Sequence, residues 1–220
     1  MRTFELSVLC EGLTEQQFVI QVLHRHLSER QIFARPQSLN PRGDGIIPWD
    51  ELRKAIKTEV GRSKNHQYTT TMIDLYKIGQ FPEAEKKAGE TIQDRVRRIE
   101  DLMKEELPNP RFIPYIQVHE FEALVFVDLD LLPRVFPDGE AIGAAKKLRR
   151  DIGNLSPEEI DDGEQTAPSK RLIRAIPAYK KRKAQAGPIL TAQIGLPRLR
   201  ADCPHFNEWV SRLEQLSQDN

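Results

Sequence analysis

Acidic residues stand at or just beyond the ends of three predicted strands in the first half of the chain. Glu11, Asp74 and Glu120 each close a short run that is rich in apolar residues. Because ligands bind beyond the carboxyl ends of the strands in a parallel sheet, we expect these carboxylates to converge. Gathered carboxylates repel one another and lose hydration unless a cation or a proton neutralises them. Oxygen ligands suit a hard divalent cation, so the pattern predicts an Mg²⁺ or Mn²⁺ site.

Two further acids lie close to these in the sequence. Glu15 comes four residues after Glu11, one helical turn on, and can therefore point toward the same crevice. The candidate metal ligands are Glu11, Glu15, Asp74, Glu120 and Glu122. Ordinary roles compete with this interpretation, since Glu15 suits the first turn of a helix, Asp74 can cap a turn, and Glu120 and Glu122 can be surface residues. The placement of acids at all three strand ends is hard to attribute to chance, which favours the joint site.

Basic residues that can contact phosphate lie in the second half of the chain. Lys170 and Arg171 belong to the stretch Pro168-Ser-Lys-Arg171, and Arg174 follows. Arginine can grip a phosphate with two parallel hydrogen bonds, whereas lysine acts as a point charge. The competing interpretation is a helix start with solvated charges. A longer basic series continues to Lys183 and can follow a nucleic-acid backbone or form a solvated face.

The elements that must position these residues alternate between strands and helices. Apolar runs with β-branched residues predict strands over 4–10, 32–39, 68–73 and 112–118, and helical spacing predicts helices over 14–30, 49–60 and 92–107. Thr14 with Gln17 resembles a capping box at the start of the first helix. Pro114 marks the last strand as bent or at an edge. Loops are expected over 40–45 and 79–89, and the apolar run after Glu120 is expected to be helical.

This order predicts an α/β fold with a parallel sheet flanked by helices. We expect a core over residues 1–128 and a mostly helical C-terminal region over 129–220 that packs on it. The chain has 220 residues, 33 Lys and Arg against 33 Asp and Glu, and 39% hydrophobic residues. That composition excludes a disordered chain and a generally basic nucleic-acid coat protein. It leaves local basic patches open.

Cysteine usage and the N-terminus bear on the compartment. Cys10 and Cys203 have no partner at metal-binding or redox-motif spacing, and the pattern favours reduced thiols. The first residues lack the hydrophobic region of a signal peptide, and no apolar run reaches the roughly 20 residues of a membrane span. We therefore expect a cytoplasmic protein without a membrane partner.

The motifs as a set resemble a known fold family. Leu9-Cys-Glu-Gly-Leu-Thr-Glu15 is similar to the first motif of the TOPRIM fold, as in the OLD-type nucleases, and Thr71-Met-Ile-Asp74-Leu-Tyr76 is similar to the second. The second motif departs from the pattern, because Tyr76 stands where the family has another acid. With Phe81-Pro82, Gln117-Val-His-Glu-Phe-Glu-Ala-Leu124, Pro168-Ser-Lys-Arg171 and Cys203-Pro-His-Phe206, the chain resembles a bacterial TOPRIM-like family of unknown function.

This resemblance implies metal-dependent phosphodiester chemistry on DNA or RNA. Glu11 would be a metal ligand or general acid/base, Asp74 a metal ligand, and Glu15 a ligand of a second ion. Either Glu120 or Glu122 replaces the acid missing at Tyr76, or the site is degenerate, and Lys170 or Arg171 would stabilise developing charge. Members of the family are often encoded beside ABC- or SMC-like ATPases in antiphage loci, which implies an ATPase partner, and a homo-oligomer is a further expectation.

Two other functions remain open at this point. A catalytically silent subunit that binds nucleic acid or senses phage would keep the acids as a remnant. A small phosphotransferase or phosphatase would use the same acids on nucleotides. His119, which precedes Glu120, is either a general acid/base or a hydrogen-bonded histidine at a strand end, and the second role is the favoured one.

Overall fold

The computed structural model describes residues 2–39, 48–62, 64–78, 81, 84–160, 163 and 165–218. The loop predicted over 40–45 lies outside the described residues, as do Pro82 and the first two residues of the loop predicted over 79–89. No helix in the described part of the chain is both long and apolar enough to cross a membrane. Cys10 and Cys203 are both buried and form no disulfide.

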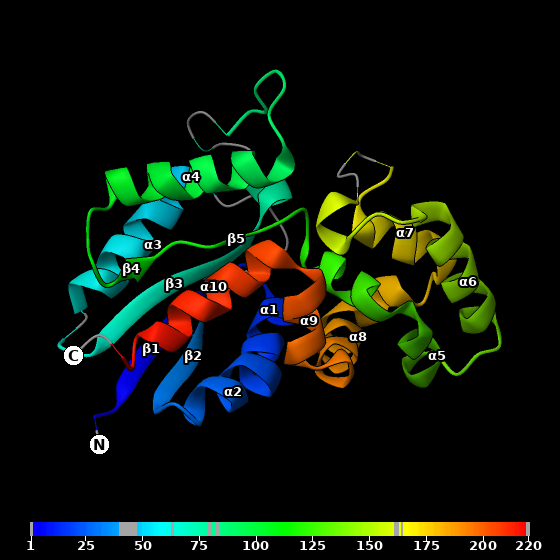
Figure 1. Ribbon diagram of the computed structural model, residues 1–220, viewed down its shortest axis with the longest axis horizontal. Helices are drawn as coiled ribbons and strands as arrows, with labels where there is room; N and C mark the ends of the chain where they lie inside the picture. Colours follow the sequence, from blue (N-terminus) through cyan, green and yellow to red (C-terminus); the bar gives the residue numbers. More distant parts are fainter. Residues whose placement is uncertain are drawn as a thin grey trace.

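A parallel five-stranded sheet forms the centre of the molecule (Figure 1). Its spatial order is β2-β1-β3-β4. β5 also pairs with β3, nearer the C-terminal end of that strand than β4 does. The strands are β1 (Phe4–Cys10), β2 (Ile32–Ser38), β3 (Gln67–Asp74), β4 (Phe112–Ile113) and β5 (Ile116–Gln117). The split between β4 and β5 contains Pro114, which has no N–H to donate to a ladder. The predicted fold class and the bent edge strand are therefore confirmed.

Helices cover both faces of this sheet. One face packs against the helical segment after β1 and the other against the two long helices of the first half, so Leu9 and its neighbours Val8 and Cys10 enter different clusters. This alternation follows from the two-residue period of a strand. The helical elements of the first half are α1 (Leu13–Phe18), a π-helical turn (Val19–Leu23), α2 (His24–Ser28), α3 (Trp49–Arg62), a 3₁₀ turn (Leu75–Lys77) and α4 (Ile92–Glu106).

The start of the first helix corrects one prediction. The N-cap is Gly12, and the Glu15 side chain accepts a hydrogen bond from the Gly12 backbone N–H at 2.9 Å. Thr14 already lies inside the helix and is buried. The predicted capping box of Thr14 and Gln17 was wrong because the helix begins two residues earlier, directly after the strand-end acid. This early start turns Glu15 back toward the end of β1.

The chain after Glu120 is helical, and its described residues contain no strand. The apolar run after Glu120 forms a 3₁₀ segment, η3 (Phe121–Leu131), which is kinked at Asp128. In Figure 1, α5 to α8 gather beside the sheet and α10 lies across it. The helical elements after η3 are α5 (Leu132–Val135), α6 (Glu140–Ile152), a 3₁₀ turn (Pro157–Glu159), α7 (Pro168–Ala175), α8 (Tyr179–Ile194), α9 (Leu196–Asp202) and α10 (Pro204–Gln215).

The last two helices return to the sheet. Residues of α9 and α10 share one hydrophobic cluster with β1 and with α1 and α2, whereas α5 to α8 build a separate cluster with η3. In the shared cluster, Trp209 stacks on Tyr115 with ring centroids 4.1 Å apart. The division of the chain at residue 128 stays a prediction.

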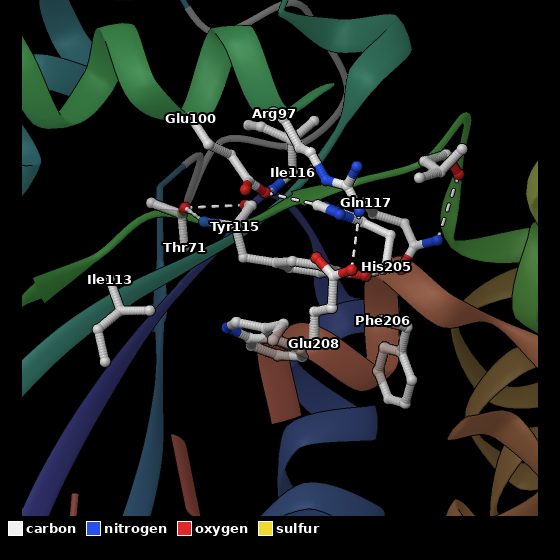
Figure 2. A network of polar contacts seen from close by, with 12 residues as sticks. Thr71, Arg97, Glu100, Ile113, Tyr115, Ile116, Gln117, His205, Phe206 and Glu208 are labelled. Carbon is white, nitrogen blue, oxygen red and sulfur yellow. Dashed lines mark hydrogen bonds and ion pairs between the residues drawn. The ribbon is translucent and has the colours of Figure 1, made fainter. Parts of the chain in front are cut away.

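A buried polar network fixes α10 to the sheet edge (Figure 2). The Glu100 carboxylate of α4 accepts hydrogen bonds from the Ile116 backbone N–H and from the His205 ring, both at 2.9 Å. The Glu158 carboxylate accepts the backbone N–H groups of His205 and Phe206, each at 3.0 Å, and so caps the first turn of α10. Every acid in this network has a local structural task.

Candidate functional site: a pocket of buried acids and lysines

The sheet register brings the three strand-end acids to one edge. Cys10 pairs with Met72, and Asp74 pairs with Gln117 of β5. Glu11, Asp74 and Glu120 all line one pocket of about 770 Å³ beyond the carboxyl ends of the strands, and so does Glu15. The convergence expected from the strand ends is thus present in the structure. Four lysines of the helical half, Lys170, Lys180, Lys181 and Lys183, line the same pocket.

Glu11 lies nearly buried at this edge, with 13% of its side chain exposed. Its Oε1 atom forms an ion pair with Lys77 Nζ at 3.1 Å, and its Oε2 atom is buried without a hydrogen-bond partner among the described residues. Burial raises the pKa of Glu11, against the opposing charges of Lys77 and Lys183. A buried oxygen without a donor is costly unless another group, such as a cation, comes to it.

Asp74 is the most deeply placed acid of the pocket. Its Oδ1 atom accepts the Phe121 backbone N–H at 2.8 Å, which ties the end of β3 to the start of η3. Burial raises the pKa of Asp74 well above its usual value, and the charges of Glu11 and Glu15 raise it further. Burial also raises the pKa of Glu15 to about 7, with a hydrogen bond from the backbone of Glu15 itself opposing the shift and the charge of Glu11 adding to it.

Glu122 lies behind these residues and is fully buried. It pairs with Lys183 of α8, whose Nζ is 3.1 Å from Glu122 Oε2, and Tyr179 donates its hydroxyl hydrogen bond to Glu122 Oε1 at 3.2 Å. Burial alone would lower the pKa of Lys183, but the charges of Glu122, Asp74 and Glu120 raise it. Lys183 therefore stays an ammonium ion and neutralises part of the acidic cluster.

Each carboxylate oxygen of Glu120 accepts a hydrogen bond from Ser169. Its Oε2 accepts the Ser169 backbone N–H at 2.9 Å, and its Oε1 accepts the Ser169 hydroxyl at 3.0 Å. Ser169 belongs to the first turn of α7, so Glu120 caps that helix from outside. The preceding residue, His119, has φ of 59°, a left-handed conformation that is rare for a side-chain-bearing residue. The turn aims Glu120 at α7, while the His119 ring lies 3.1 Å from the Glu158 carbonyl oxygen, the strand-end role favoured from the sequence.

The predicted phosphate contacts are distributed over two places. Lys170 is exposed and lines the pocket, whereas Arg171 and Arg174 donate to the backbone oxygens of Thr166 and Gln165. Those bonds hold the turn that precedes α7. The structure brings Lys170 to the acids and places the two arginines outside the residues that line the pocket.

Comparison with known families then places the chain. A model of the family described as "Domain of unknown function (DUF4276)" matches residues 10–214. The chain belongs to this family. No curated protein matches the DUF4276 chain.

Two solved structures are similar to this DUF4276 chain at low identity. Both are of the "C-terminal region of the Xanthomonas campestris pv. campestris OLD protein". The first has 14% identity and a TM-score of 0.43 over 95% of each chain, and the second has 11% identity and a TM-score of 0.40 over 94% of this chain and 96% of the other. TM-scores of this size do not establish a common fold, and they carry nothing about activity.

The donor set of the pocket fits a divalent cation only in part. Within the described ranges, no three carboxylates, imidazoles or thiolates are grouped so that they could share one metal ion. Mg²⁺, however, is commonly held by one or two carboxylates, with water and substrate phosphate completing its shell. Glu11, with its unpartnered buried oxygen, and Asp74, whose pKa the charge of Glu11 raises, fit that smaller requirement.

Two lysines in the DUF4276 pocket matter more than the sequence indicated. Lys77 was not singled out, although it stands three residues after Asp74 and one 3₁₀ turn brings it back to Glu11. Lys183 was noticed only as part of a basic series, because its partner Glu122 is 61 residues away in sequence. The one available signal was the short spacing between Asp74 and Lys77.

Proposed function

We propose that this protein is an Mg²⁺- or Mn²⁺-dependent, TOPRIM-like nuclease that hydrolyses phosphodiester bonds of DNA or RNA. The observation that carries the proposal is the meeting of Glu11, Glu15 and Asp74 with lysines in one pocket beyond the strand ends. Acids with raised pKa values in a cleft are typical of a functional site. Lysines at the same pocket supply the positive charge that a polyanionic substrate requires.

Within this proposal the residues of the pocket have different roles. Glu11 and Asp74 would hold the cation, and Glu15, with a pKa of about 7, would hold or release a proton beside them. A bound Mg²⁺ supplies charge neutralisation at the phosphate and an acidified water. Lys170 would orient the phosphate from the exposed rim, and Lys183 would hold positive charge at the inner wall. Glu120 and Glu122 would position α7 and Lys183 respectively.

A cleavage assay tests this function. Supercoiled plasmid, single-stranded DNA and tRNA are incubated with the purified chain in Mg²⁺, Mn²⁺ or EDTA, alone and with an ATPase encoded beside it. We expect metal-dependent products with the native chain and none with Glu11→Gln or Asp74→Asn. Asp130→Asn is the matched control, because Asp130 pairs with Arg149 on the surface away from the pocket. Equal products from the native chain and the Asp74→Asn variant would contradict the proposal.

A catalytically silent nucleic-acid-binding subunit is the second candidate. It is favoured by the ion pairs of Glu11 with Lys77 and of Glu122 with Lys183, which neutralise acids without any added cation. It predicts that the chain binds nucleic acid equally well with EDTA and with Mg²⁺, and that no metal yields products. An ABC- or SMC-like ATPase partner and a role in antiphage defence fit both candidates and follow from the sequence resemblance alone.

A further inference from the structure

The mouth of the pocket carries apolar side chains that the hydrolytic chemistry does not require. Tyr76 is 48% exposed and Leu13 is 64% exposed, and both line the pocket. They come from different elements, the 3₁₀ turn after β3 and the start of α1. An exposed apolar residue alone is ordinary, but an aromatic ring and a second apolar side chain that both line one charged pocket indicate a ligand with a flat apolar face.

The lysines that line the same pocket indicate that this ligand also carries negative charge. Lys170, Lys180 and Lys181 are exposed and line the same pocket as Tyr76. An aromatic platform beside a cationic groove is the combination that binds successive units of a single-stranded nucleic acid. The ring offers a stacking surface for the base, and the ammonium groups face the phosphates.

The burial of the acids favours an unpaired base at this position. Asp74 is 3% exposed and Tyr76 follows it in the 3₁₀ turn after β3, so the buried acid and the exposed ring line the same pocket from adjoining positions. In a duplex both faces of each base are already covered by stacking, and a base must leave the stack to meet a protein side chain. A pocket of about 770 Å³ has the size of sites that enclose a ligand of small-molecule dimensions.

We propose that the pocket takes a single-stranded nucleic acid, with one unpaired base stacked on Tyr76 and the adjoining phosphate between the buried acids and the lysines. The proposal rests on the proposed function for the place of the phosphate, and it adds the substrate class. It also gives a binding role to the residue that replaces an acid in the second motif.

Binding and cleavage measured in parallel test this inference. A dye-labelled 12-nucleotide strand, as DNA and as RNA, and the corresponding duplexes are titrated with the protein in EDTA, and anisotropy reports the dissociation constant. We expect Tyr76→Ala to weaken single-strand binding by about fivefold or more, the loss that corresponds to removing one stacked base. Tyr76→Phe keeps the ring and should stay within about twofold. Leu155→Ala, which removes an equally exposed apolar side chain outside the lining residues, should have no effect.

The outcomes separate this inference from the proposed function. Unchanged single-strand binding by Tyr76→Ala, or duplex binding as tight as single-strand binding with the same dependence on Tyr76, overturns the inference even if metal-dependent cleavage is found. Tyr76-dependent single-strand binding without any metal-dependent cleavage supports the inference and removes the nuclease. Absence of binding to every strand overturns the inference, and cleavage by the same preparation then decides the proposed function.

Discussion

Two regions of this protein bury carboxylates, one where α10 meets β5 and one in the pocket beyond the strand ends, and they handle the charge differently. Beside α10, the Glu100 carboxylate accepts the Ile116 N–H and the His205 ring contact (Figure 2). The Glu158 carboxylate accepts the backbone N–H groups of His205 and Phe206. In the pocket, Glu11 keeps a buried oxygen without a partner among the described residues, and burial raises the pKa values of Asp74 and Glu15, to which the charge of Glu11 adds. Asp74 and Glu15 also accept one backbone N–H each, but they lie crowded with Glu11 in one pocket, and acids crowded in this way are kept at a cost and indicate function.

The largest expected effect is that a substitution in the pocket removes activity without loss of stability, whereas one beside α10 lowers stability without loss of activity. Asp74→Asn keeps the acceptor for the Phe121 N–H and removes a charge from the crowded pocket. We expect at least about a 100-fold loss of metal-dependent cleavage with the melting temperature unchanged or raised. Glu100→Gln should leave metal-dependent cleavage unchanged and lower the melting temperature, because it weakens the buried ion pair with His205 and lies outside the pocket lining. Cleavage rates and circular-dichroism melts measure the two effects for both variants. Parallel losses of activity and stability in either variant would contradict the separation of a functional pocket from a structural network.

The second effect is the cost of removing a helix cap. Glu158→Ala leaves the buried N–H groups of His205 and Phe206 without an acceptor. We expect a loss of about 3 kcal/mol in the free energy of unfolding, since each unsatisfied buried donor costs on the order of 1–3 kcal/mol. Urea denaturation measures it, and Glu158→Gln, which retains an acceptor oxygen, should lose less. A cost below about 0.5 kcal/mol would mean that the cap is unimportant.

The pH dependence of stability tests the charge state of Glu15 in the pocket. The pKa of Glu15 is raised to about 7 from an ordinary value of 4.5, so the folded state binds more protons than the unfolded state between these values. The stability that this group contributes is therefore present below pH 4.5 and is lost as the pH rises to 7, by on the order of 3 kcal/mol. Glu15→Gln should flatten this part of the stability profile measured without metal. Profiles that are identical for the two proteins would show that Glu15 is ionised in the folded state.

The smallest effect concerns the packing that holds the pocket walls together. A Cβ atom added at Gly187 of α8 would lie 2.9 Å from the Phe121 ring and 3.2 Å from the Thr14 side chain. Phe121 and Thr14 adjoin the acids Glu120 and Glu15, so Gly187 lets three pocket elements approach closely. Gly187→Ala should cost about 1–3 kcal/mol of stability. Gly143→Ala in α6 meets nothing within 4 Å and should instead stabilise by about 0.5–1 kcal/mol, which thermal denaturation can compare.

The sequence predicted the sheet and its acidic edge because both depend on local patterns. Strand periodicity fixed the places of Glu11 and Asp74, and Pro114 correctly indicated a broken strand. The partners of the acids were not predictable in this way. Lys183 reaches Glu122 through the rotation of α8, and Ser169 reaches Glu120 through the placement of α7, which are matters of tertiary packing.

The capping error has a related cause. The sequence pattern at Thr14 satisfied a local rule, but Glu15 itself accepts the Gly12 N–H and so starts the helix earlier. An acid that is both a helix cap and a member of the pocket has two roles, and a rule for either role alone misplaces it. Local motifs therefore located the candidate site, while three-dimensional packing decided which of its acids hold structure.

The central claim is that Glu11 and Asp74 form a cation site while the acids beside α10 do not. Isothermal titration of the metal-free protein with Mn²⁺ at pH 7.5 tests it most directly. We predict saturable binding by the native chain, loss of that binding in Asp74→Asn and in Glu11→Gln, and full retention in Glu100→Gln. Equal Mn²⁺ binding by the native chain and Asp74→Asn, or no binding by the native chain, would contradict the claim.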